Sequence, residues 1–218
     1  MNSIIHIAMI DDEVLFRKSM AFLLNEEKNI NIIFDGDNGQ DLLKFLKKSE
    51  RHPDIILMDI RMPVMNGIDT SKIISEKYPK IKIIIISSYD SDHFIEQMVQ
   101  YGACAYLVKQ SDPQTVIHTI NQVYRYGVYF PADMLNNIIN TKRLTNKHSD
   151  PVLKDLSERE VEILNLIYQQ FNTKEIAEKL YISERTVEGH RKNMLDKTKS
   201  KNVVGFILYG IKNNLLSV

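Results

Sequence analysis

The sequence predicts an α/β domain with a doubly wound, five-stranded parallel sheet, followed by a small all-α domain of four helices. Over residues 1–130, short β-branched runs alternate with amphipathic stretches of helical length. The run Ile81-Lys-Ile-Ile-Ile-Ile86 is apolar on both faces, which is typical of a central strand covered by helices on each side. From residue 151 onward only the helical period remains.

Each element of the α/β part is predicted from its own local pattern. Gly102 and Gly127 stand where helices should end, and Pro113 stands where one should begin. The predicted strands are Ile4–Ile10, Ile30–Phe34, Ile55–Met58, Ile81–Ile86 and Ala105–Val108. The predicted helices are Val14–Asn25, Gln40–Lys48, Ser71–Tyr78, Asp92–Tyr101 and Pro113–Tyr126.

The C-terminal part is predicted from its helix starts. Ser157 and Asn172 are each followed three residues later by Glu, the pattern of a capping box, and Ser183 is a further N-cap candidate. These starts give helices near 157–169, 173–180, 184–198 and 202–214. Because residues 140–151 are polar and without periodicity, we expect a linker there. The predicted division is a domain at 1–130, a linker at 131–151 and a domain at 152–218.

The composition is that of a globular protein, with 44% hydrophobic residues and 28 basic against 28 acidic side chains. The first domain has a small acidic excess, and the second has a small basic excess. The single Cys104 excludes an internal disulfide and a multi-cysteine zinc site. The N-terminus lacks the pattern of a signal peptide, and no apolar run approaches the roughly 18 residues that span a bilayer. We therefore expect a soluble, cytoplasmic protein without a membrane partner.

Three carboxylates are predicted to lie at the carboxyl ends of neighbouring strands. Asp11 and Asp12 follow the first strand, and Asp59 follows the third. In an open parallel sheet of flavodoxin-like order these strands are neighbours, and the ligand crevice lies beyond their carboxyl ends. Close carboxylates repel one another unless a cation lies among them. Oxygen ligands in a crevice open to solvent suit Mg²⁺.

Two further residues complete a predicted phosphoryl site. Ser87 ends the fourth strand and can donate a hydroxyl hydrogen bond, and Lys109 ends the fifth and can pair with Asp59 or its phosphate. A carboxylate nucleophile, a metal ion and a cation around one phosphoryl group are what phosphoryl transfer requires. Each residue alone would more often be a turn former, a loop hydroxyl or a solvated charge. Five matched residues at four strand ends favour a functional site.

Four motifs carry a family resemblance. They are Ile10-Asp-Asp-Glu13, Leu57-Met-Asp-Ile-Arg-Met-Pro-Val-Met-Asn-Gly67, Ile86-Ser-Ser88 and Gly102-Ala-Cys-Ala-Tyr-Leu-Val-Lys109. On these motifs residues 1–130 resemble a receiver domain. The resemblance implies that Asp59 is the phosphoacceptor for a sensor histidine kinase, and that Asp12 and Asp59 bind Mg²⁺ directly. Asp11 would act through water and Arg61 through its backbone carbonyl.

The same resemblance implies a conformational switch. Ser87 would reorient toward the phosphate, and Tyr106 would turn inward behind it. The added charge of about −1.5 to −2 would bias a two-state surface of the receiver. One departure from the family is Gln110, which stands where receivers commonly have Pro, so we do not expect the usual cis peptide there.

A helix-turn-helix is predicted in the C-terminal domain, with helices at Lys174–Leu180 and from Glu184. On the second helix an inward stripe is formed by Val187, Met194, Leu195 and Thr198. The opposite face carries Arg185, Glu188, Gly189, Lys192 and Asp196. Gly189 costs about 1 kcal/mol in a helix interior, and a close approach to DNA would explain it. Charge alone favours a solvated helix surface over a DNA contact.

The segment from Leu156 to Met194 resembles a LuxR-type DNA-binding domain, through Leu156-Ser-Glu-Arg-Glu160, Asn172-Thr-Lys-Glu175 and Ile182-Ser-Glu-Arg-Thr-Val-Glu-Gly-His-Arg-Lys-Asn-Met194. With the receiver, the chain resembles the NarL/FixJ class of response regulators. The resemblance implies base contacts by Glu188, Gly189 and Lys192, and phosphate contacts by Thr186, His190 and Arg191. Arg185 is a further candidate for DNA contact. Glu188, where many relatives carry Lys, makes the face less basic.

We therefore expect a transcription factor whose activation by phosphorylation produces a homodimer that binds double-stranded DNA. The last helix would be the dimerisation surface, with Val203, Phe206, Ile207 and Gly210. No enzyme activity is expected beyond the receiver's own phosphoryl transfer and dephosphorylation.

Three alternative interpretations remain. An aspartyl-phosphate phosphatase would need a second acid at position 61, where Arg61 stands. A receiver could instead act by protein contact without phosphorylation. The C-terminal domain could also bind protein in place of DNA, which a salt-dependent DNA shift would exclude.

Overall fold

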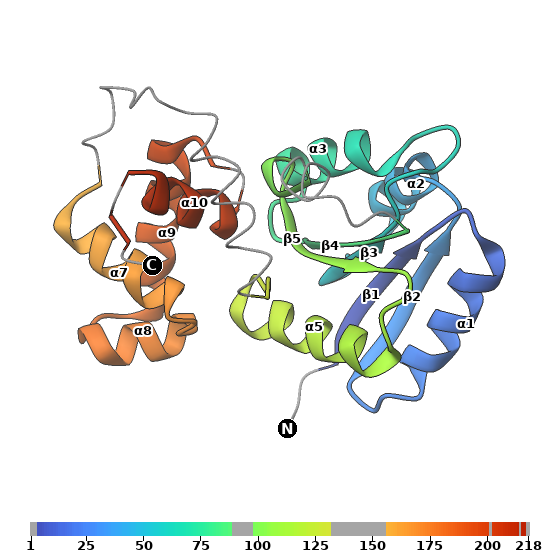
Figure 1. Cartoon of the computed structure of the whole chain (residues 1–218), viewed down its shortest axis with the longest axis horizontal. Coiled ribbons are helices and arrows are strands. Elements are labelled where there is room, and N and C mark those ends of the chain that lie inside the picture. The colour runs from blue at the N-terminus through green and yellow to red at the C-terminus, as the bar shows by residue number, and fades with distance from the viewer. Residues whose placement is uncertain (1–3, 89–97, 132–155, 201, 214, 217–218) are drawn as a thin grey trace. The chain divides into compact units, whose positions relative to one another are not determined.

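The computed structural model describes residues 4–88, 98–131, 156–200, 202–213 and 215–216. The chain divides into two compact units, Met1–Tyr129 and Phe130–Val218. The first is an open sheet with helices on both faces, and the second is helical (Figure 1). The predicted linker at 131–151 lies, apart from Pro131, outside the described residues, so the predicted domain boundaries stay predictions.

The N-terminal unit contains a five-stranded parallel sheet with the strand order β2-β1-β3-β4-β5. This confirms the predicted doubly wound sheet. Strands β3 and β4 are almost wholly buried on both faces, as their continuous apolar runs indicated. The strands are β1 (Ile5–Ile10), β2 (Ile30–Gly36), β3 (Ile55–Met58), β4 (Lys82–Ser87) and β5 (Ala103–Val108).

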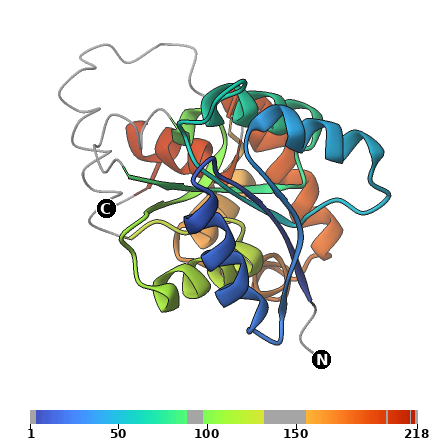
Figure 2. The same cartoon turned by 90° about the vertical axis from the view of Figure 1, so that its right-hand side faces the viewer.

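Helices α1 and α5 cover one face of this sheet, and α2 and α3 cover the other (Figure 1 and Figure 2). On the first face, Met20 and Leu24 of α1 and Ile120 of α5 pack against β-strand residues in one buried cluster. The bounds are α1 (Val14–Asn25), α2 (Gly39–Lys48), α3 (Gly67–Lys77) and α5 (Pro113–Tyr126).

Two helix predictions for this unit need comment. Helix α3 begins four residues before the predicted Ser71, because the side chain of Asn66 caps the helix by accepting a hydrogen bond from the Asp69 N–H. The predicted helix Asp92–Tyr101 lies mostly outside the described residues.

The C-terminal unit contains four described helices: α7 (Glu158–Tyr168), α8 (Thr173–Leu180), α9 (Glu184–Thr198) and α10 (Val203–Lys212). Both predicted capping boxes form, at Ser157 and Asn172, and Ser183 accepts from the Thr186 N–H. Tyr181 ends α8 in the left-handed conformation and makes the turn into α9. No helix in the described part of the chain is long and apolar enough to cross a membrane.

The last helix corrects one prediction. Phe206 is fully buried and Ile207 nearly so, and a Cβ added at Gly210 would lie 2.8 Å from Leu164 of α7. These residues therefore pack in the core of their own unit. For Phe206, Ile207 and Gly210 the expectation of a dimerisation surface is wrong, because these three residues are buried within their own domain. Val203 is half-buried, and its part in dimerisation stays a prediction.

Candidate functional site

Four predicted site residues meet at the carboxyl edge of the sheet. Asp11 and Asp59 directly follow β1 and β3, Ser87 ends β4, and Lys109 directly follows β5. The backbone continues the sheet pairing past these points, since the Asp59 N–H donates to the Ile10 carbonyl at 2.9 Å and the Lys109 N–H donates to that of Ser87 at 2.8 Å. The parallel register of the strands thus fixes all four residues at one edge.

Lys109 is the centre of this site. Its Nζ lies 2.8 Å from Asp11 Oδ2, 2.8 Å from Glu13 Oε1 and 3.0 Å from Asp59 Oδ2. The Asp11 contact is an ion pair without hydrogen-bond geometry. The Lys109 side chain is only 7% exposed and lies over the Phe16 ring, 4.9 Å from its centroid. Burial alone would lower the pKa of Lys109, but the three carboxylates outweigh it and raise the pKa well above its ordinary value.

The acidic cluster can accept a divalent cation. Oxygen atoms of Asp11, Glu13 and Asp59 lie within 4.8 Å of one another. Three carboxylates beside one ammonium group leave a local excess of negative charge. Burial raises the pKa of Asp11, and the neighbouring Lys109 opposes this rise. An all-oxygen donor set with this charge fits Mg²⁺.

The predicted ligand set and this cluster differ in their members. Asp12 and Arg61 are exposed and lie outside the cluster, so their roles at a metal stay predictions. Glu13 was not predicted, although it lies at the start of α1 beside the two predicted aspartates. Its place two residues after Asp11, in the short connection between β1 and α1, is the signal that could have identified it.

The main chain around Asp59 is closely packed. Asp59 Oδ1 accepts a hydrogen bond of 2.6 Å from the Ile60 N–H. A Cβ at Gly67 would lie only 2.2 Å from the Asp59 carbonyl oxygen, so only glycine lets α3 begin this close to the site. Ser87 is fully buried and Tyr106 is 3% exposed, which places both side chains inside the unit.

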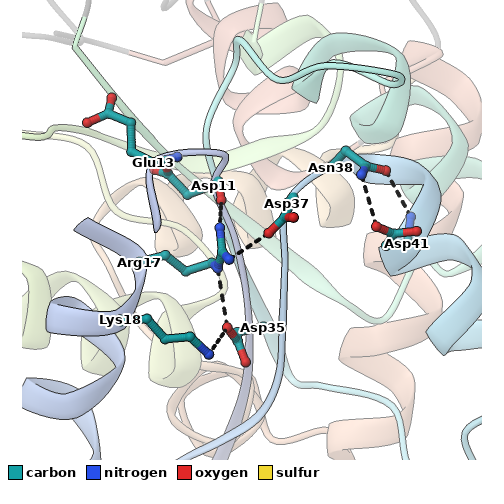
Figure 3. A network of polar contacts seen from close by, with 8 residues as sticks. All are labelled: Asp11, Glu13, Arg17, Lys18, Asp35, Asp37, Asn38 and Asp41. Carbon is teal, nitrogen blue, oxygen red and sulfur yellow. Dashed lines mark hydrogen bonds and ion pairs between the residues drawn. The ribbon is translucent and has the colours of Figure 1, made fainter. Parts of the chain in front are cut away.

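A buried arginine lies behind Asp11 (Figure 3). The guanidinium of Arg17 donates from Nη1 to the Asp11 carbonyl, from Nε to Asp35 Oδ2 at 3.2 Å, and contacts Asp37 Oδ1 through Nη2 at 2.5 Å. Lys18 Nζ shares Asp35 Oδ2 at 2.7 Å. The Lys18 hydrogen bond, together with that from Arg17, holds the pKa of Asp35 below its ordinary value against the effect of burial.

Helix α9 has the two faces predicted for it. Val187 and Met194 are buried. Of the predicted DNA-contact residues, the exposed ones are Arg185, Thr186, Glu188, Gly189 and Lys192, and the half-buried ones are His190 and Arg191. A Cβ added at Gly189 would meet no described heavy atom within 4 Å, so packing inside the domain does not require glycine there.

A polar cluster links α9 to the start of α8. Arg191 Nη1 donates to Thr173 Oγ1 at 2.7 Å and to Glu188 Oε1 at 3.2 Å. The Thr173 hydroxyl donates to the same Glu188 oxygen at 2.8 Å. Arg191, expected near DNA phosphate, is therefore paired with a carboxylate within the domain.

Two family models match the chain, one in each unit. Residues 7–121 match the response regulator receiver domain, and residues 154–209 match the bacterial regulatory proteins of the luxR family. The chain is 35% identical over 215 residues to the transcriptional regulatory protein LnrK of Bacillus subtilis (strain 168), covering 95% of this chain and 97% of that protein.

Solved structures agree with these matches at the level of the fold. Salmonella typhimurium RcsB covers 96% of this chain and 98% of its own, with 21% identity and a TM-score of 0.55. An RcsB–DNA complex covers 95% and 98%, with 20% identity and a TM-score of 0.57. The chain therefore belongs to the NarL/FixJ class of two-component response regulators, transcriptional regulators in which a receiver domain is joined to a LuxR-type DNA-binding domain.

Proposed function

We propose that Asp59 accepts a phosphoryl group from a sensor histidine kinase, with Mg²⁺ as cofactor, and that this modification controls DNA binding. The observation that carries the proposal is the cluster in which Lys109 Nζ lies 2.8 to 3.0 Å from the carboxylates of Asp11, Glu13 and Asp59. It brings a carboxylate nucleophile and a counter-charge together at the edge of the sheet where ligands bind.

In the proposed reaction an Asp59 oxygen bonds to phosphorus while the bond from phosphorus to the kinase imidazole nitrogen breaks, and the electron pair stays with that nitrogen. Lys109, already beside Asp59 Oδ2, pairs with a phosphoryl oxygen. We assign Asp11, Asp12, Asp59 and the Arg61 main-chain carbonyl to hold Mg²⁺. When bound, the ion supplies positive charge against the phosphoryl oxygens. The receiver's own phosphorylation and dephosphorylation are the only chemistry that we propose.

The proposed output is dimerisation and DNA binding in the bacterial cytoplasm. Ser87 would turn toward the phosphoryl group, and Tyr106 would be the aromatic switch behind it. The exposed face of α9 supports DNA contact, as does the likeness to RcsB, which forms a DNA complex. We assign this contact to Arg185, Thr186, Glu188, Gly189, His190, Arg191 and Lys192.

The test uses beryllofluoride as a phosphoryl analogue. Full-length wild type and Asp59→Asn would each be studied with Mg²⁺, with and without beryllofluoride, by light scattering for mass and by fluorescence anisotropy for DNA affinity. We expect mass and affinity to rise in the wild type and to stay unchanged in Asp59→Asn, because the amide lacks the carboxylate oxygen that bonds to beryllium in the acyl-phosphate analogue.

Asp54→Asn is the matched control, because Asp54 precedes the strand that Asp59 follows and lies at the opposite edge of the sheet. It should respond like the wild type. A response of Asp59→Asn to beryllofluoride equal to that of the wild type would reject Asp59 as the acceptor. A wild type that stays folded and gives no response would reject control by phosphorylation.

A further inference from the structure

Arg17 connects the start of α1 to the acidic site, although it lies outside the cluster of site carboxylates. We infer that Arg17 is a positioning residue: by binding the main-chain carbonyl of Asp11, it sets where the acidic side chains of the β1–α1 loop lie relative to Asp59. This inference rests on the proposed function, because the consequence is stated as the affinity of the site for Mg²⁺.

The first step of the argument is that Asp11 is held from several sides. Its N–H donates to the Gly36 carbonyl at 3.1 Å, and its carboxylate Oδ1 accepts from the Glu13 N–H at 2.8 Å. Its carbonyl accepts from Arg17. With these three groups bound, the remaining atom, Oδ2, is directed at Lys109, toward the place proposed for the cation. Removal of the Arg17 contact frees the peptide between Asp11 and Asp12 to rotate.

The second step is that Arg17 itself has little freedom. Its side chain is 7% exposed, and besides the Asp11 carbonyl its nitrogens bind two carboxylates from one other part of the chain: Asp35, in β2, and Asp37, just after β2. Figure 3 shows the guanidinium between the Asp11 carbonyl and these two carboxylates. A buried arginine that is paired in this way has one position, and it therefore gives the Asp11 carbonyl one position.

The third step is that the contact requires arginine. Three different nitrogens, Nε, Nη1 and Nη2, serve three acceptors that lie in different directions. A lysine has a single nitrogen at this place and cannot reach all three together, although it keeps the charge. Arg17→Lys therefore separates the positioning contact from the positive charge.

The experiment measures Mg²⁺ binding to the full-length, unphosphorylated protein by titration calorimetry. For Arg17→Lys we expect a Kd for Mg²⁺ about tenfold higher than in the wild type, the usual effect of changing a residue that orients metal ligands. Beryllofluoride binding, followed by fluorine NMR, should need correspondingly more Mg²⁺ for half-saturation and reach the wild-type level at saturation. A loss of amplitude at every Mg²⁺ concentration would indicate misfolding in place of positioning, and it would overturn the inference.

Two control variants make the result specific. Lys18→Met removes the other cation on Asp35 but leaves the Asp11 carbonyl bound, so its Kd should stay within about twofold of the wild type. Leu24→Ala destabilises the same helix at its far end through the core, and its Kd should also stay unchanged.

The outcomes separate this inference from the proposed function. If the wild type binds Mg²⁺ and beryllofluoride while Arg17→Lys binds Mg²⁺ equally well, only the role of Arg17 is overturned. That role is also overturned if either control variant loses as much affinity as Arg17→Lys. If the wild type binds neither ligand, the proposed function and this inference both fail.

Discussion

The two regions of the chain that carry functional charges differ in how far these charges are exposed to solvent. At the receiver site Lys109 is 7% exposed and touches three carboxylates, two of them buried. On α9 of the DNA-binding domain the side chains of Arg185 and Lys192 are exposed to solvent. Buried charges are costly unless they are paired, whereas exposed charges are screened and cost little.

This difference indicates which kind of ligand each region suits. The receiver site holds its charges at fixed distances, as is required for a small ligand such as a phosphoryl group or a cation. The α9 face leaves the charges of Arg185 and Lys192 exposed to solvent, which suits a polyanion whose contacts are many and salt-dependent. We therefore expect changes at the first site to alter folding stability and changes at the second to alter binding.

The largest effect is expected for Lys109→Met. Without Mg²⁺, the loss of the ammonium group among three carboxylates should lower the free energy of unfolding of the receiver by about 3 kcal/mol. Urea denaturation, read from hydrogen exchange of the β3 amides, measures this unit separately. Lys18→Met is the control, since Lys18 is 61% exposed and should contribute less than about 1 kcal/mol. Equal losses of unfolding free energy in both variants would contradict the difference between buried and exposed charges.

The next effect concerns Lys192 on the exposed face. Lys192→Ala should weaken DNA binding by about 1–2 kcal/mol and lower the slope of the salt dependence by about one. The unfolding free energy should not change, because the side chain is exposed. Fluorescence anisotropy at several salt concentrations measures both the affinity and its salt dependence. Lys179→Ala, on α8 over the Phe171 ring, is the matched control and should bind DNA as the wild type does.

The sequence predicted most elements of the fold because apolar patterning reports directly on burial. Helices α1, α5, α8 and α9 have the predicted bounds, and the strands differ by at most two residues at either end. The start of α3 was missed because it depends on a single side-chain hydrogen bond, that of Asn66, in a segment without apolar periodicity.

The site was predicted less completely than the fold. The strand-end positions of Asp11, Asp59, Ser87 and Lys109 follow from the topology. The participation of Glu13 depends on how a side chain turns at a helix start, and the burial of Arg17 depends on two acids at and after the end of β2. A charged residue on a helix is usually interpreted as a surface residue, and a linear pattern does not reveal a buried one.

The apolar face of α10 illustrates the same limit of sequence patterns, here for apolar residues. Phe206 belongs to an apolar stripe in either case, whether the partner is another chain or another helix. Periodicity predicts that such a face is covered but does not identify what covers it.

A smaller effect is expected for Glu160, a buried and paired charge in the DNA-binding domain that resembles those of the receiver site. Glu160 has a side chain that is 3% exposed and pairs with Lys197 at 2.9 Å. Burial would raise its pKa, but hydrogen bonds from Lys197 and the Ser157 N–H outweigh burial and hold the pKa below the ordinary 4.5.

Because the pKa is lower in the folded state, the stability that Glu160 adds is present above pH 4.5 and is lost as the pH falls through the folded pKa. Glu160→Gln should cost about 1 kcal/mol at neutral pH and remove this part of the acid sensitivity. Urea unfolding, read from the α7 amides at neutral and acid pH, measures it. Glu162→Gln, in an exposed pair with Arg159 on the same helix, should keep the acid sensitivity. Equal curves for wild type and Glu160→Gln would contradict the prediction.

The smallest effect concerns Glu188, the acid in the middle of the exposed face. Its carboxylate pairs with Arg191 at 3.2 Å and accepts from Thr173, so it reduces the positive charge that Arg191 can offer to a phosphate. Glu188→Gln should tighten binding to DNA of random sequence about threefold at low salt and steepen its salt dependence. Glu162→Gln, which removes an acid from a similar arginine pair on α7, should not do so. If both variants tighten binding equally, net charge alone governs the affinity, and the position of Glu188 on the exposed face does not matter. If only Glu188→Gln does so, Glu188 acts locally: it weakens the attraction of this face to any DNA backbone and leaves binding more dependent on base contacts.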